Sequence, residues 1–106
     1  MSEITAGSQT AVIGTEHSLT TQSNFGTYQL LVDLANLAAD DVLELRGKVK
    51  ARAAEGSVKT IYQATFKHAQ TIPVTASIPI MGSAIEFTLK QTAGTGRAFP
   101  WSVNSP

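Results

Sequence analysis

The glycine-rich segment at residues 92–97 is the stretch that most resembles a site for chemistry, because backbone amides of such loops can cradle a phosphate. The segment lacks the spacing that ends in Gly-Lys-Ser/Thr, and no helix is predicted to follow it. The dinucleotide-binding pattern fails for the same reason. We therefore interpret residues 92–97 as a structural turn in which Arg97 reaches a carboxylate or backbone carbonyls.

The side chains that could bind a metal ion do not form a recognised pattern. His17 and His68 are far apart, and neither belongs to a His-x-His or His-Glu-x-x-His motif. Asp33, Asp40 and Asp41 lack the alternating oxygen ligands of a calcium-binding loop. The sequence favours capping or turn roles for these aspartates and hydrogen-bonded or surface positions for the histidines.

Residue types for covalent or acid–base catalysis are equally unpatterned. The chain has no cysteine and no Gly-x-Ser-x-Gly elbow, and neither histidine neighbours a serine in a recognisable arrangement. Five glutamates could act as paired carboxylates only if the fold brought them together: Glu3, Glu16, Glu44, Glu55 and Glu86. We expect a protein that is not an enzyme and that needs no cofactor or metal.

Charged side chains alternate with apolar ones between residues 42 and 52, which includes Arg46 and Lys48 on the charged side. This period of two collects the charges on one face of a strand. Such a face could hold an acidic partner, but more often it is the solvated side of a half-buried sheet. Eight Lys plus Arg balance eight Asp plus Glu, so the chain lacks the charge expected of a protein that binds nucleic acid.

The elements that must position these residues are predicted to be strands. Residues 42–52 and 59–67 form a hairpin around residues 53–56, with Tyr62, Ala64 and Phe66 inward and Ile61 outward. Residues 34–41 form a compact loop or a single helical turn. Further strands are expected in residues 10–22, centred on Val12 and Ile13, in 27–33, buried on both faces, in 85–90 and in 101–103. Residues 71–80 contain two prolines and are expected to form either an edge strand or an extended connection.

This succession of short strands and turns predicts an all-β fold, an antiparallel β-sandwich or jelly-roll-like barrel with extended termini. Residues 1–10 are small and polar and are expected to form an N-terminal arm, which leaves residues 11–106 as a single β domain. No run approaches the ~20 apolar residues that a membrane span requires, so no membrane partner is expected.

Three segments carry a resemblance to a known class of proteins. They are Gly-Thr-Tyr-Gln-Leu-Leu-Val-Asp-Leu (26–34), Asp-Val-Leu-Glu-Leu-Arg (41–46) and Phe-Thr-Leu-Lys-Gln-Thr-Ala-Gly-Thr-Gly-Arg-Ala-Phe-Pro-Trp (87–101). In these segments the chain resembles the capsid decoration, or cement, proteins of tailed bacteriophages. The resemblance covers most of the chain from about residue 25 onward and includes no catalytic signature.

The resemblance implies a β-rich subunit, commonly a homotrimer, that is made in the host cytoplasm. It would bind the major capsid protein on the outer surface of the phage head and clamp neighbouring shell subunits together. The residues expected at the partner interface are Ile4, Val12, Ile13, Arg46, Lys48, Arg97, Phe99 and Trp101. The alternative is a phage tail or fibre β-sandwich module that binds a receptor or carbohydrate.

Overall fold

The computed structural model describes residues 2–52, 54, 56–76, 79–82 and 84–106. These residues contain nine strands and no helix, and thus no helix that could cross a membrane. In chain order the strands are β1 (Ser2–Thr10), β2 (Glu16–Gln22), β3 (Gly26–Asp33), β4 (Val42–Val49), β5 (Lys59–Lys67), β6 (Val74–Ala76), β7 (Ile80–Gly82), β8 (Ile85–Ala93) and β9 (Ala98–Ser105).

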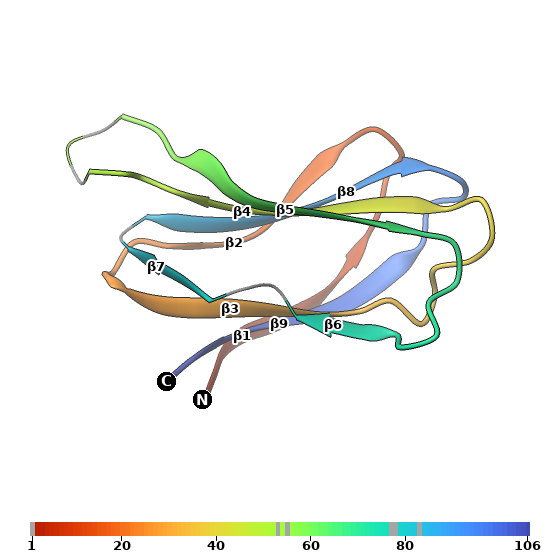
Figure 1. Ribbon diagram of the computed structural model, residues 1–106, viewed down its shortest axis with the longest axis horizontal. Coiled ribbons are helices and arrows are strands. Elements are labelled where there is room, and N and C mark those ends of the chain that lie inside the picture. Colours follow the sequence, from red (N-terminus) through yellow and green to blue (C-terminus); the bar gives the residue numbers. More distant parts are fainter. Residues whose placement is uncertain (1, 53, 55, 77–78, 83) are drawn as a thin grey trace.

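The strands form two antiparallel sheets that pack face to face, which confirms the predicted sandwich (Figure 1). One sheet has the order β1-β9-β3-β6, with β7 also paired to β3, and the other has the order β2-β8-β4-β5. The two sheets do not close into a barrel.

The strand pairing is that of a jelly roll. β1 pairs with β9, β2 with β8, β3 with β6 and β4 with β5, so the chain folds back on itself as one long antiparallel ribbon. The β3–β9 and β4–β8 pairings then roll this ribbon into two four-stranded layers, to which the short β7 is an addition. This connectivity recurs in viral capsid and lectin domains and in other binding folds.

The strands with the clearest sequence alternation have the predicted faces. Leu43 and Leu45 of β4 are buried, whereas the alternating charged residues Glu44 and Arg46 are more exposed, on the opposite face. Tyr62, Ala64 and Phe66 of β5 likewise face inward, and Ile61 is exposed. The tip of this hairpin includes residues 53 and 55, which lie outside the described part of the chain.

Three local predictions differ from the structure. The expected arm is edge strand β1, because Ser2–Thr10 pairs with β9 along its length and its polar side chains suit an exposed edge. Val12 and Ile13 do not centre a strand but lie in the turn that precedes β2. Strand β3 is buried on one face rather than both, since residues of intermediate exposure alternate with the buried Tyr28, Leu30 and Val32.

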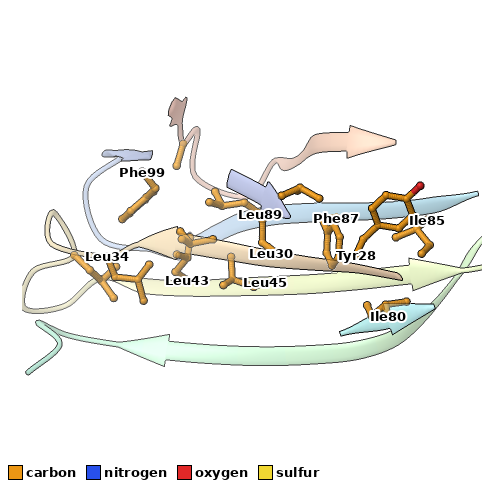
Figure 2. Close-up of a cluster of buried hydrophobic side chains, with 14 residues drawn as sticks. Tyr28, Leu30, Leu34, Leu43, Leu45, Ile80, Ile85, Phe87, Leu89 and Phe99 are labelled. Atoms are coloured by element: carbon orange, nitrogen blue, oxygen red, sulfur yellow. The ribbon is translucent and has the colours of Figure 1, made fainter. Parts of the chain in front are cut away.

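The core lies between the two layers (Figure 2). Leu30 of β3, Leu45 of β4, Phe87 of β8 and Phe99 of β9 all belong to it, and all four are at most 2% exposed. The aromatic and branched side chains of both inner faces interdigitate, as is typical of sandwich packing. Phe99 was expected at a partner interface, but it fills the core and no partner can reach it without unfolding the protein.

The remaining connections follow from local chemistry. Residues 34–41 form the predicted compact loop, which Leu34 and Leu37 anchor by burying their side chains. The segment after β5 forms the short edge strand β6, in keeping with its prolines, and it also contains the first residue of β7, which pairs with β3 as well. Strand β9 extends well beyond the three residues expected, because β1 and β3 pair with it on both sides.

Candidate functional site

Four connections lie together at one end of the sandwich, on the right in Figure 1. They join β1 to β2, β3 to β4, β5 to β6 and β8 to β9, because a jelly roll returns its chain to the same end after every second strand. We call residues 11–15, 34–41, 68–73 and 94–97 at this end the loop platform.

Backbone hydrogen bonds tie the connections of the loop platform to each other and to the strand ends. The donor and acceptor pairs are Ala11 N to Arg97 O (2.8 Å), Gly14 N to Gln91 O (2.8 Å), Leu34 N to Pro73 O (2.7 Å) and His68 N to Asp41 O (2.9 Å). Bonds between loops far apart in the sequence reduce the number of conformations that each loop can adopt. The platform is therefore preorganised, and a partner that binds it would order few groups.

The carboxylate of Asp41 holds the centre of the loop platform and is only 1% exposed. Its Oδ2 accepts hydrogen bonds from Ala38 N (2.9 Å) and Arg97 Nε, and its Oδ1 accepts one from Thr95 N (3.0 Å). Burial alone would raise the pKa of Asp41, but these hydrogen bonds outweigh it and lower the pKa. Arg97 thus reaches a carboxylate, as the sequence predicted. The structural turn begins only after β8 ends at Ala93, and residues 94–97 pass around an internal anion.

Gln91 near the end of β8 is a second buried polar residue beside this turn, and it was not among the predicted site residues. Its Nε2 donates to Ala93 O (3.1 Å) and Thr95 O (2.7 Å), and its Oε1 accepts from Arg97 N (3.3 Å). A signal was present, because Gln91 continues the inward alternation of Ile85, Phe87 and Leu89. A polar side chain at an inward position needs internal partners, and the adjacent turn supplies them.

Apolar side chains project from this rigid frame into solvent. Val12 and Ile13 in the first connection are 58% and 41% exposed, and Ile72 in the third is 78% exposed. Exposed branched side chains on a preorganised surface are available for contact with a partner. Val12 and Ile13 thus remain accessible, as the interface prediction requires, whereas Ile72 was not among the predicted interface residues.

Arg46 and Lys48 of β4 lie on the outer face of the β2-β8-β4-β5 sheet and bind carboxylates of the same chain. Arg46 contacts Glu16 (3.2 Å) and Glu44 (2.9 Å), and Lys48 Nζ lies 2.7 Å from Glu16 Oε2. Hydrogen bonds from Lys48 and from the buried Thr88 lower the pKa of Glu16. These internal pairs favour the solvated-face interpretation, because an acidic partner would have to displace them.

The two histidines and the nearby aspartates have structural contacts. His17 Nε2 accepts a hydrogen bond from Val12 N (3.1 Å), and His68 Nδ1 accepts one from Asp40 N (3.3 Å). Asp33 Oδ1 accepts from Ala35 N (2.9 Å), which is the expected turn role. Within the described ranges, no three His, Asp or Glu residues gather at metal-binding distance.

A shallow hollow of about 280 Å³ crosses the outer face of the β1-β9-β3-β6 sheet. Leu31, Val74 and Pro100 contribute apolar surface, and Glu3 and Asp33 contribute carboxylates. Neither histidine lines this hollow. The two carboxylates can accept hydrogen bonds from a ligand that lies in the hollow.

The remaining predicted interface residues lie apart. Ile4 is exposed on β1, whereas Trp101 is half-buried on β9 and packs at the margin of the core. The structure also exposes two large apolar residues at the opposite end, Phe25 and Met81, which the sequence analysis did not select.

Comparisons with protein-family models, with curated proteins and with solved structures found no match for this chain.

Proposed function

We propose that this chain is a capsid decoration protein, which binds the outer surface of a phage head through its loop platform and clamps neighbouring shell subunits. The observation that carries the proposal is the rigid platform with its exposed Val12, Ile13 and Ile72. A cement protein needs a rigid fold that presents preformed contact surface. The jelly roll, which also occurs in viral capsids, supplies that frame, although a fold by itself does not assign a function.

Binding in this proposal comes from apolar contact. Val12 and Ile13 are adjacent in one turn, and Ala11 beside them is buried and bonded to Arg97 O. Full burial of a Val or Ile side chain contributes about 1.5–3 kcal/mol. The two residues together would then change affinity more than tenfold, since about 1.4 kcal/mol corresponds to a factor of ten. Many copies on one shell would add these modest contributions.

The test is a binding assay with particles assembled from the major capsid protein of the phage that encodes this chain. The double variant Val12→Asp/Ile13→Asp is expected to lose more than tenfold in affinity. Ile61→Asp is the matched control, because Ile61 is also 58% exposed but lies on β5, outside the loop platform. Unaltered binding of the double variant, or an equal loss in the control, would reject the platform as the contact surface.

A receptor- or carbohydrate-binding module of a phage tail or fibre is the second candidate. The hollow on the β1-β9-β3-β6 sheet supports it, because Glu3 and Asp33 could accept hydrogen bonds from sugar hydroxyls. A glycan array separates the two proposals. Binding to a glycan that Asp33→Asn abolishes, without binding to shells, would favour the second candidate.

A further inference from the structure

The four outer edges of the two sheets differ in how well they are protected against strand addition. Edge strand β6 has three residues and follows Pro73, and β5 carries a lysine at each end. Edge strand β2 is interrupted by a register shift between Ser18 and Thr20. Short length, proline, lysine and bulges are the devices by which proteins block pairing between edges.

Strand β1 has none of these devices over most of its length. After a register shift between Glu3 and Thr5, it pairs regularly with β9 from Thr5 to Thr10. These six residues, Thr-Ala-Gly-Ser-Gln-Thr, contain no charge and no proline. In the described structure, the one side-chain hydrogen bond to the backbone of β1 runs from Gln9 Nε2 to Thr10 O. The outer edge of β1 is therefore a regular template for another strand.

Trp101 approaches this edge from the inner face of the sheet. Its register partner is Gly7, and a Cβ at Gly7 would meet indole atoms of Trp101 at 3.1–3.4 Å. The ring therefore lies over the backbone of the edge strand, in space that any other residue at position 7 would occupy. Trp101 is only partly buried there, so part of its side chain stays accessible beside an unpaired strand edge.

We propose that two copies of this chain associate by antiparallel pairing of their β1 strands about a twofold axis at Gly7. In this register Thr5 faces Gln9 of the second copy, and Ala6 faces Ser8. The indole rings lie over the two neighbouring Gly7 residues and cover each other from solvent. Aromatic residues in such positions contribute strongly to interfaces.

The charges of the chain permit this self-association. Glu3 is the only charged residue of β1. Antiparallel pairing centred on Gly7 separates the two copies of Glu3 by eight residues along the strand, or about 27 Å. The formal net charge of the chain is zero, so two copies do not repel each other as wholes. The pairing does not depend on the proposed function, because it concerns the free protein.

The experiment measures molar mass by light scattering and the emission of the protein's single tryptophan over a concentration series. We expect the mass to rise from 11.2 kDa toward twice that value, with a blue shift of Trp101 emission. The variant Ala6→Lys/Ser8→Lys places lysines directly opposite each other across the axis and is expected to abolish both changes. The control variant Gln63→Lys/Thr65→Lys places the same charges on the outer face of edge strand β5. It is expected to retain both the rise in mass and the shift of the emission.

Several outcomes would overturn the inference. They are a constant monomer mass, a threefold mass as the resemblance to decoration proteins implies, or association that Ala6→Lys/Ser8→Lys leaves intact. Hydrogen exchange of the unmodified protein gives an independent answer if that variant fails to fold. Amides of residues 5–9 should exchange more slowly at high protein concentration, and equal exchange at low and high concentration would refute the pairing.

Discussion

Replacement of Asp41 by asparagine removes one charge from the centre of the loop platform without changing the size of the side chain. All three partners of the Asp41 carboxylate are donors: Ala38 N, Thr95 N and Arg97 Nε. An asparagine side chain offers one acceptor oxygen, and its NH2 group must then point at one of the donors. In either orientation at least one buried N–H therefore loses its acceptor.

The expected loss of stability follows from these contacts. A buried donor without a partner costs about 1–3 kcal/mol. The lost charge-assisted bond to Arg97 adds to this, although the addition is reduced because the Arg97 side chain is 34% exposed. We expect Asp41→Asn to lower the free energy of unfolding by about 2–4 kcal/mol, which is a large part of the 5–15 kcal/mol typical of a domain.

The measurement is urea denaturation of both proteins between pH 2 and pH 7. Because the pKa of Asp41 is lowered in the folded protein, its ionised form stabilises the protein fully above the unfolded value of about 3.8. That contribution is lost as the pH falls from this value through the folded pKa. The difference between the proteins should therefore be constant near neutral pH and shrink in acid.

Asp40→Asn is the control, since it removes the same charge from an exposed neighbour and is expected to change stability by less than about 0.5 kcal/mol. A loss below about 1 kcal/mol for Asp41→Asn at pH 7, or a difference that persists unchanged to pH 2, would refute the role assigned to Asp41.

Two further substitutions test the same framework. Gly94→Ala should destabilise the protein by at least about 2 kcal/mol, because Gly94 has a φ of +92° and a Cβ there would collide with Asp41. Thermal unfolding measures the loss. The control is Gly56→Ala, since a Cβ at Gly56 would meet no atom within 4 Å. Equal melting temperatures for the two variants would contradict it. Glu16→Gln should cost about 0.5–1 kcal/mol, since it weakens contacts to Arg46 and Lys48 that are only partly buried, and the cost should shrink in 0.5 M salt. A cost independent of salt would mean that these ion pairs do not account for it.

Much of the strand architecture could be predicted because local side-chain patterns encode it. The alternation in β4, β5 and β8 identified both the strands and their buried faces. Proline marked the edge position of β6. The role of Arg97 was predicted in kind, but its partner was not, since Asp41 lies 56 residues away and only the fold brings them together.

Predictions failed where a neighbour determines the structure. Residues 2–10 have little to bury and were expected to form an arm, yet they form β1 because β9 offers them a ladder partner. Val12 and Ile13 have the composition of a strand, but the chain must turn there to pass from one sheet to the other. Phe99 looked like an interface residue because nothing in the sequence near it indicates that β9 is a central strand.

The sequence by itself determined that this chain would be all-β and left a β-sandwich and a jelly-roll-like barrel open, because a period of two in the side chains separates a core face from a solvent face within each strand. Only the tertiary structure decided that the strands wind as a jelly roll, that four loops form one platform, and that β1 keeps an open edge. Those features depend on hydrogen bonds between segments far apart in the chain, and local pattern does not specify which strands will meet.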